Sequence, residues 1–487
     1  MRLQSLAAAT ALTLVLAGCA SSGGLHPDGK LLEPSALQAR HSLAAHADAD
    51  AAWPAADWWT GLGDSQLDAL IAEALANNPG LAAADARARQ AQAAAGIADA
   101  ARGPSVNAGA AVSGAHLPAT VMPSDVGGGH FAWAKYGYLS FNWGLDLWGG
   151  KRAAWEAAVG QGRAAEVEAR AARIELSANV ARAYAQLGYA YAQQDVAEAE
   201  LERAHKAREL TAQRVHAGID SKLQLRQGDA EVAGAEQQLA LASRAIDAAR
   251  SALSVLLGKG PDRGLDIARP QLLAPAQLAA PANLPVDLLG HRADLVAARW
   301  RVEAAASDIK SAKTQFLPNV DIGALAGLVA MGSTNLLQAP ARFYQVGPSL
   351  SLPIFDGGRL RANLSASDAQ YDLAVAQYNR TLVGALNQVA DDYAAQQSLV
   401  TQIDAQQRAL DAANDAWRLA QQRYEAGVGS YLEALSVRQQ LLVAEQRMAA
   451  LEAQQVDLSV QLIQALGGGY RPDAVDSATP ASTPAQS

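Results

Sequence analysis

The residues that could carry out catalysis or bind a metal ion are few and scattered along this chain. Its eight histidines form no HExxH motif and no other metal-ligand spacing, and Cys19 is the only cysteine. Gly149-Gly150-Lys151 lacks the remaining residues of a phosphate-binding loop. The sequence therefore predicts neither an enzyme nor a site for a metal ion or cofactor.

The one chemistry that the sequence does indicate is covalent lipidation of Cys19. An apolar stretch from Leu6 to Ala17 follows Arg2, which is typical of an export signal and too short for a transmembrane helix. Leu16-Ala17-Gly18-Cys19 resembles the bacterial lipobox, in which the cysteine becomes the lipidated first residue. Ala20 follows it where an aspartate would favour inner-membrane retention, so this resemblance implies the outer membrane. We expect a signal peptide over residues 1–18.

The charge of the chain excludes one class of partner. The formal net charge is −9, and no run of lysines or arginines interrupts the sequence. Nucleic-acid binding requires a basic face. We therefore expect no nucleic-acid partner and attribute the acidity to solubility.

The chain is a tandem duplication. Residues 213–260 and 422–469 align without a gap, at an offset of 209 residues. Gly218 and Ser221 in the first copy correspond to Gly427 and Ser430 in the second, and each pair is typical of a helix C-terminus followed by an N-cap. Two similar helical hairpins, each with its tip at one of these turns, are therefore predicted.

Alternation of period two predicts a β-hairpin in each repeat. In the first repeat, alternation begins at Val106 and returns from Tyr136 to Trp143 after a Gly/Pro-rich loop. The second repeat shows the same pattern from Val320 to Leu328 and from Tyr344 to Leu352. We place the hairpins at about 104–148 and 318–355, which gives four strands in all.

The rest of the chain is predicted to be mainly helical. One helix runs from Ser65 to about Ala101, and two proline-free stretches, Lys151–Val215 and Arg359–Tyr424, could each extend ~95–100 Å. Apolar residues seven apart, as in Ile403, Leu410 and Trp417, indicate coiled-coil packing. Small residues between them predict shallow seams suited to a wall of helices.

The strands are long enough to cross a membrane, since about ten tilted residues suffice. Aromatic residues gather near their ends, as in an aromatic girdle. The girdle candidates are Trp133, Trp143, Trp148 and Phe355. Four strands cannot close a barrel, so membrane insertion requires several copies, and three copies give 12 strands. The alternative is a soluble four-stranded sheet with an aromatic core.

Several motifs together resemble the outer membrane factors of Gram-negative bacteria, the TolC-like exit ducts, and especially their NodT-type lipoproteins. The motifs are the lipobox at Cys19, the segments 57–71, 74–79 and 291–295, Phe316-Leu317-Pro318-Asn319, and the segment 352–359. The resemblance covers the chain from about Trp53 to Gly469. It implies a mainly α fold with a membrane β-barrel: a homotrimer whose 12-stranded barrel, embedded in outer-membrane lipid, continues as a long periplasmic α-helical barrel.

The same resemblance implies a function and partners. The expected function is passive conduction of drugs or other small solutes within a tripartite efflux pump, docked to a periplasmic adaptor and an inner-membrane pump of RND or related type. The hairpin tips at Gly218, Ser221, Gly427 and Ser430 would contact the adaptor. A duct for type I protein secretion, or a periplasmic coiled-coil scaffold or adaptor lipoprotein, remains the alternative.

The resemblance also places the gate at the hairpin tips, where the family often carries acidic residues. Glu433 occupies the first such position of the second hairpin, Ser436 the next, and Gln224 the matching position of the first hairpin. Tyr424 and Arg423 are candidates for a polar lock, with ordinary helix-end residues as the alternative.

These predictions divide the chain into six segments. A lipidated tether covers residues 19–64, the two repeats cover 65–260 and 285–469, and a linker at 261–284 joins them. A tail rich in Ser, Thr, Pro and Ala, at 470–487, is expected to be disordered.

Overall fold

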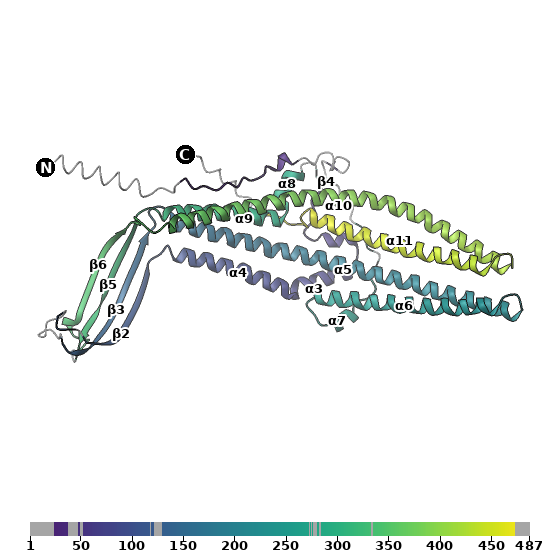
Figure 1. The fold of residues 1–487 in the computed structure, drawn as a ribbon, viewed down its shortest axis with the longest axis horizontal. Helices are drawn as coiled ribbons and strands as arrows, with labels where there is room; N and C mark the ends of the chain where they lie inside the picture. The colour runs from purple at the N-terminus through teal and green to yellow at the C-terminus, as the bar shows by residue number, and fades with distance from the viewer. Residues whose placement is uncertain are drawn as a thin grey trace. The chain divides into compact units, whose positions relative to one another are not determined.

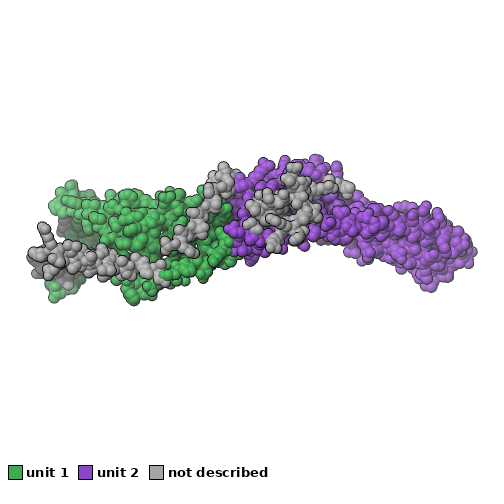
Figure 2. Space-filling model, turned by 90° about the horizontal axis from the view of Figure 1, so that it is seen from above, with its two compact units in different colours: residues 1–31, 87–165, 298–378 green, residues 32–86, 166–297, 379–487 purple. Residues whose placement is uncertain are grey.

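The computed structural model describes residues 24–37, 47–48, 52–116, 118–120, 129–271, 273, 275, 280–281, 284–332 and 335–472. The expected signal peptide, Cys19 and most of the expected tail lie outside these residues. The chain forms two compact units, coloured separately in Figure 2. Unit 1 contains residues 1–31, 87–165 and 298–378, and unit 2 contains residues 32–86, 166–297 and 379–487. Each unit therefore takes segments from both repeats, as expected for repeats that share a core.

Unit 1 contains one antiparallel sheet of four strands (Figure 1). The strands are β2 (Ser105–His116), β3 (Phe131–Leu145), β5 (Asn319–Met331) and β6 (Arg342–Ser351), in the order β2-β3-β5-β6. The predicted four strands are thus confirmed. The pairing of β3 with β5 joins the two hairpins into one sheet, and β2 and β6 form its edges.

The strand register separates the side chains into two faces. Val106 pairs with Phe141, Phe141 with Ala324, and Ala324 with Val346, and directly opposed residues share a face. We call this side the apolar face. It comprises Val106, Ala108, Ala110, Val112, Gly114 and His116 of β2; the odd-numbered residues 131–145 of β3; the even-numbered residues 320–330 of β5; and Arg342, Tyr344, Val346, Pro348 and Leu350 of β6. The opposite face is largely small or polar, with Asn107, Ser140 and Asp321 among its residues.

The helices adjoining this sheet within unit 1 pack through a small apolar core. That core consists of Ile309, Ala312, Phe316, Leu360 and Leu364. Close approach of the backbones depends on Gly160, where an added Cβ would lie 3.0 Å from the Cβ of Ala304. The alanine-rich composition therefore permits tight helix contact in this unit.

Two pairs of helices have matching lengths in the two repeats. Helices α5 (Gly150–His216) and α10 (Arg359–Glu425) have 67 residues each, and α6 (Lys222–Leu256) and α11 (Tyr431–Ala465) have 35 each. The predicted bounds of the long helices are correct to within a residue. Alanines are the commonest buried residues of α5, as at Ala178, Ala181 and Ala204, which agrees with the predicted shallow seams. Helix α10 buries mainly Leu, Val and Tyr instead, as at Leu382 and Val389, so its seam is deeper than predicted.

The helix predicted from Ser65 to Ala101 is interrupted, so that prediction was wrong in one respect. It forms α3 (Ser65–Asn77) and α4 (Pro79–Ala100), separated by Asn78 in an extended conformation. Pro79 lacks an N–H and disfavours helical geometry at the residue before it. The Asn78 side chain accepts a hydrogen bond from the Gly80 N–H at 2.7 Å, which caps α4.

The tether expected over residues 19–64 ends earlier than predicted. Trp58–Leu62 forms the 3-10 helix η2, and its Trp58 and Leu62 are buried in the core of unit 2. Asp64 caps α3 and accepts a hydrogen bond from the Tyr184 hydroxyl at 2.6 Å. Burial of these apolar side chains stabilises an ordered segment where the composition alone indicated an extended one.

The remaining elements complete the chain order, and most of them are short. They are η1 (Pro34–Ala36), β1 (Ala47–Asp48) paired in parallel with β4 (Ala280–Pro281), α7 (Asp262–Leu265), α8 (Leu284–His291), α9 (Ala293–Thr314) and η4 (Ala339–Ala341). Across the described ranges, no helix is both long and apolar enough to span a membrane.

Candidate functional site

Both hairpin tips have the geometry that the sequence predicts. Gly218 and Gly427 adopt φ values of +75° and +76°, a left-handed conformation that glycine adopts without strain. Ser221 and Ser430 follow as the N-cap residues of α6 and α11. The two copies therefore turn in the same way at their tips.

A buried tyrosine connects the two hairpins just inside the tips. Tyr424, on α10, is 4 % exposed and donates a hydrogen bond from its hydroxyl to the Asp220 carboxylate of the first tip, at 2.7 Å. Its hydroxyl also lies 3.2 Å from that of Thr211 on α5. A side chain from the second copy is thus held by polar groups of the first.

Arg214 completes this contact, which we call the tip cluster (Thr211, Arg214, Asp220 and Tyr424). Its guanidinium lies 2.9 Å from the Asp220 carboxylate and 4.6 Å from the centre of the Tyr424 ring, and it donates to the Tyr424 carbonyl at 3.1 Å. Burial opposes ionisation of Asp220, but hydrogen bonds from Arg214 and Tyr424 outweigh it and lower the pKa of that carboxyl. Burial raises the pKa of Tyr424. The cluster therefore holds an ionised aspartate against a neutral tyrosine at neutral pH.

A second ionic group, which we call the arginine cluster, joins the hairpins further from the tips. Arg438 of α11 is 2 % exposed and contacts Glu200 of α5 at 3.1 Å and Glu231 of α6 at 2.9 Å. Arg203 contacts Glu200 at 3.2 Å and Glu445 at 2.6 Å. Burial raises the pKa of Glu200, while the two arginines act in the opposite direction. Because α5, α6 and α11 all contribute, moving one hairpin past the other would separate buried charges.

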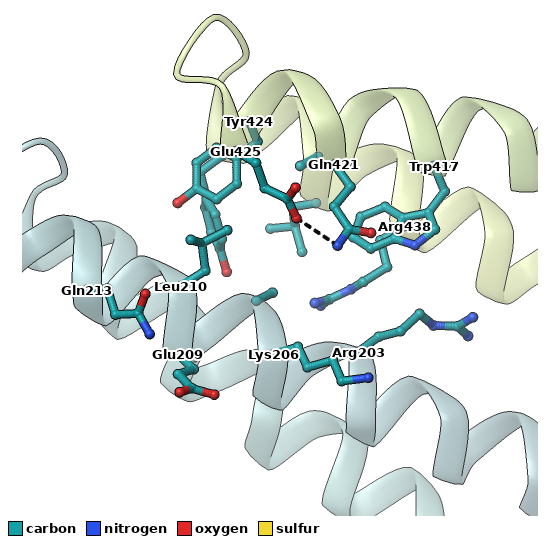
Figure 3. Close-up of a pocket in the computed structure, with 14 residues that line it drawn as sticks. Arg203, Lys206, Glu209, Leu210, Gln213, Trp417, Gln421, Tyr424, Glu425 and Arg438 are labelled. Atoms are coloured by element: carbon teal, nitrogen blue, oxygen red, sulfur yellow. Dashed lines mark hydrogen bonds between the residues drawn. The ribbon is translucent and has the colours of Figure 1, made fainter.

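A pocket of about 520 Å³ lies between the hairpins, and both clusters contribute to its walls (Figure 3). Arg203 and Leu210 line it from α5, and Trp417 and Tyr424 line it from α10. Tyr424, Tyr431 and Ala434 form an apolar cluster on one side, against which Leu210, Trp417 and Leu435 pack. The contact between the hairpins is thus not filled completely.

The other predicted gate residues are more exposed than Tyr424. Arg423 and Glu433 form an exposed pair at 3.7 Å, and Ser436 is exposed on the next turn of α11. The Gln224 side chain accepts hydrogen bonds from the N–H and hydroxyl of Ser221, at 2.5 and 2.6 Å, and so belongs to the helix cap. The structure thus brings Arg423 together with Glu433 and assigns Gln224 to the local fold of the first tip.

Apolar side chains project from both tips at equivalent positions. Ile219 and Val428, which are 209 residues apart, are 64 % and 72 % exposed. Leu223 and Leu432, with the same separation, are 68 % and 62 % exposed. Pairs of exposed aliphatic residues repeated at two tips indicate a contact surface.

The girdle candidates lie near the two ends of the sheet. Trp133 and Trp143 project from the apolar face of β3, and the Trp143 indole donates to the Arg102 carbonyl at 3.2 Å. Trp148 and Phe355 lie beyond the strands, where Trp148 donates to the Pro318 carbonyl at 2.8 Å and Phe355 is 92 % exposed. The apolar side chains on this face are also largely exposed in a single chain, which is unfavourable in water.

Sequence reasoning missed the acidic and basic partners of these clusters. Asp220 aligns with Gly429 at the 209-residue offset, so a comparison of the two copies could have singled it out. Arg438 and Glu445 are seven residues apart, and each follows a seam leucine by three residues, which is a core position of a heptad. A charge at a core position indicates a buried ionic contact. No group of three or more His, Cys, Asp or Glu residues suited to a metal ion occurs in the part of the chain that the structure describes.

One family model matches each half of the chain separately. The model described as "Outer membrane efflux protein" matches residues 70–259 and again residues 284–468. The two matches agree with the internal duplication.

Individual relatives show the same similarity. The chain is 36 % identical over 368 residues to the fusaric acid resistance protein FusA of Burkholderia cepacia, covering 74 % of this chain and 69 % of FusA. It is 30 % identical over 470 residues to the multidrug resistance outer membrane protein MdtP of Escherichia coli, covering 94 % of this chain and 95 % of MdtP. The crystal structure of the outer membrane protein VceC of Vibrio cholerae superposes with a TM-score of 0.80 at 36 % identity, covering 86 % of this chain and all of VceC.

Proposed function

The chain belongs to the outer membrane efflux protein family and is the outer membrane channel component of an efflux pump, and we propose that it works as a homotrimer closed by a 12-stranded β-barrel. The observation that supports this most strongly is the apolar face, which extends across all four strands with an unpaired edge at each side. An open edge in lipid leaves backbone groups without partners. Pairing β2 of one copy with β6 of the next removes every edge.

In such a barrel the two faces of the sheet have different surroundings. The apolar face contacts lipid, and the opposite face, with Asn107, Ser140 and Asp321, lines a water-filled interior. Solutes then cross without any chemical step in this chain, and the energy comes from the pump. Cys19 adds a lipid anchor in this proposal.

The hairpin tips are the proposed docking site for a periplasmic adaptor, through which an inner-membrane pump of RND or related type is engaged. Ile219, Leu223, Val428 and Leu432 would supply apolar contacts, and the turns at Gly218, Ser221, Gly427 and Ser430 would fix their spacing. Three copies would present six tips of two kinds. Substitution of these exposed residues is not expected to disturb the core of unit 2, since none of them belongs to it.

The gate is proposed to lie at the same tips. The tip cluster and the arginine cluster both link the first hairpin to the second, so their contacts must change if the hairpins separate. Glu433 is exposed and paired with Arg423 only at 3.7 Å. Three Glu433 carboxylates near one axis would attract cations and disfavour anions.

The test is single-channel recording from the purified full-length protein in planar bilayers, with its mass in detergent measured alongside. We expect a trimer that conducts in small, infrequent steps, and Glu433→Ala should lower cation selectivity. Glu425→Ala, at an exposed position on the preceding helix, is the control. A monomer that does not insert would refute the channel, and unaltered selectivity in Glu433→Ala would refute only the acidic ring.

A further inference from the structure

A shallow groove crosses the apolar face of the sheet, outside the regions discussed for gating. Its volume is about 270 Å³. Ala324 and Ala326 of β5 form its floor, Leu139 and Phe141 of β3 form one wall, and Tyr344 and Val346 of β6 form the other. These pairs lie in adjacent rows of the register, so the groove follows the direction of β5. Because small residues are flanked by large ones, the groove has a shape that an extended apolar chain would fill.

Two cations lie on the same face beyond one end of this groove. Arg342 pairs with Leu328, one row beyond Ala326 and Tyr344, and Lys135 pairs with Ala330, one row further. The backbones of these two residues are about 12 Å apart, because two strand spacings and one row of the register separate them. Both side chains are long enough to reach toward one ligand between them. No ion pair joins either cation to another residue of the described ranges.

The position of these cations follows the depth rule for a lipid-facing sheet. A charge at mid-depth costs several kcal/mol, whereas one near the interface costs about 0–1 kcal/mol. Lys135 and Arg342 lie toward the end where β2 meets β3 and β5 meets β6, away from the long helices. The apolar face carries no acidic residue, although the chain as a whole has a net charge of −9. Charge on this face is thus positive and lies in the half of the sheet next to the strand connections.

We propose that Lys135, Arg342 and the groove over β5 form a binding site for a phosphorylated lipid of the outer leaflet. The inference rests on the proposed barrel, in which the long helices lie in the periplasm and the strand connections face the exterior. An acyl chain lies along Ala324 and Ala326, and the phosphate groups accept hydrogen bonds from Lys135 and Arg342. The exposed Trp133 and Phe131, 5.7 Å apart between ring centres, flank the headgroup region.

The experiment measures lipid retained by the full-length trimer in detergent, using native mass spectrometry with four added lipids. The probes are diphosphoryl lipid A, monophosphoryl lipid A, phosphatidylglycerol and phosphatidylethanolamine. Diphosphoryl lipid A should bind most tightly, and Lys135→Ala combined with Arg342→Ala should weaken it about thirtyfold, since each cation near a membrane surface contributes about fivefold. Ala326→Leu, which fills the groove and keeps both charges, should also weaken it.

Arg152→Ala is the matched control, because Arg152 is an exposed cation that follows the other end of β3. It should retain lipid A as the wild type does. Equal retention by the wild type and the double variant would overturn the site, and preference for phosphatidylglycerol would overturn its assignment to the outer leaflet. Because the apolar face lies opposite the barrel interior, the double variant should conduct normally. A wild-type chain that forms no trimeric channel would instead refute the proposed function.

Discussion

At the scale of residues, the hydroxyl of Tyr424 is one point where the two copies of the repeat depend on each other. The first copy has Val215 at the equivalent position, and the second has Gly429 where the first has Asp220. These differences make the two tips chemically distinct. Even so, Tyr424 of the second copy binds Asp220 and Thr211 of the first. Each copy therefore contributes one half of a single contact.

Tyr424→Phe removes this contact with the smallest change in volume. It leaves Asp220 and Thr211 without the tyrosine hydroxyl, at a cost of about 1–3 kcal/mol to the contact between the hairpins. We expect longer and more frequent open states in single-channel recordings. Tyr431→Phe is the control, since its buried hydroxyl has no hydrogen-bond partner within the described structure. An equal effect of both substitutions would mean that packing, and not the hydrogen bond, holds the tips.

Asp392 predicts a dependence of stability on pH. Burial and, to a lesser extent, the Asp391 carboxylate raise its pKa to about 6, against the opposing effect of Arg292. The unfolded chain releases this proton near the ordinary pKa of 3.8, so the folded state loses stability as pH rises from about 4 to about 6 and then stays level. Asp392→Asn should therefore stabilise the protein by about 2 kcal/mol per chain at pH 7.5, after allowance for solvent screening, and by little at pH 4. Thermal unfolding at both pH values measures this stabilisation. Asp391→Asn, at the exposed neighbouring position, is the control and should not stabilise the protein to a comparable extent.

At the scale of elements, most of the fold could be predicted from the hydrophobic periodicity and from the positions of proline, glycine and capping residues. The absence of proline gave α5 and α10 to within a residue, and alternation gave the four strands and their apolar face. Local sequence patterns failed to predict the segments whose secondary structure depends on tertiary contacts. Trp58–Leu62 has no periodicity of its own and is ordered by burial in the core of unit 2, and Asn78 interrupts a helix whose apolar pattern continues on both sides. The partners of Tyr424 and Arg438 come from distant elements, so their pairing depends on the fold.

The arginine cluster should determine how firmly α11 is held against the first hairpin. Arg438→Met leaves Glu200 and Glu231 without their shared cation, and we expect a loss of about 3–5 kcal/mol. Adding Glu200→Met should restore much of the loss, because Glu200 is the more deeply buried of the two carboxylates and keeps only Arg203 as a partner. Chemical unfolding of the four proteins in a double-mutant cycle measures this. Arg418→Met, at an exposed pair with Asp415, is expected to change stability by less than about 0.5 kcal/mol.

At the scale of the whole molecule, the symmetry of the proposed trimer explains how the internal duplication is used. Three copies of a chain with two similar hairpins would give six tips, which alternate in character around the axis. The exposed apolar residues are alike at all six, since Ile219 and Leu223 recur as Val428 and Leu432. The polar groups differ, with Arg214 bound to Asp220 at one tip and Arg423 facing Glu433 at the other. A partner could thus meet six equivalent apolar contacts while the gate keeps threefold symmetry.

Closure of the barrel is the prediction on which the assembly depends. A cysteine at Ala108 of β2, combined in turn with one at Tyr344, Val346 or Leu350 of β6, places a thiol on each edge of the sheet. If neighbouring copies pair edge to edge, at least one combination should form disulfides that convert the protein to a covalent trimer on a non-reducing gel. Leu139→Cys with Val346→Cys is the control, because β3 lies inside the sheet and its Leu139 cannot reach another copy's edge. Monomers from every combination would refute the barrel, and a ladder beyond three copies would indicate open association instead of a closed ring.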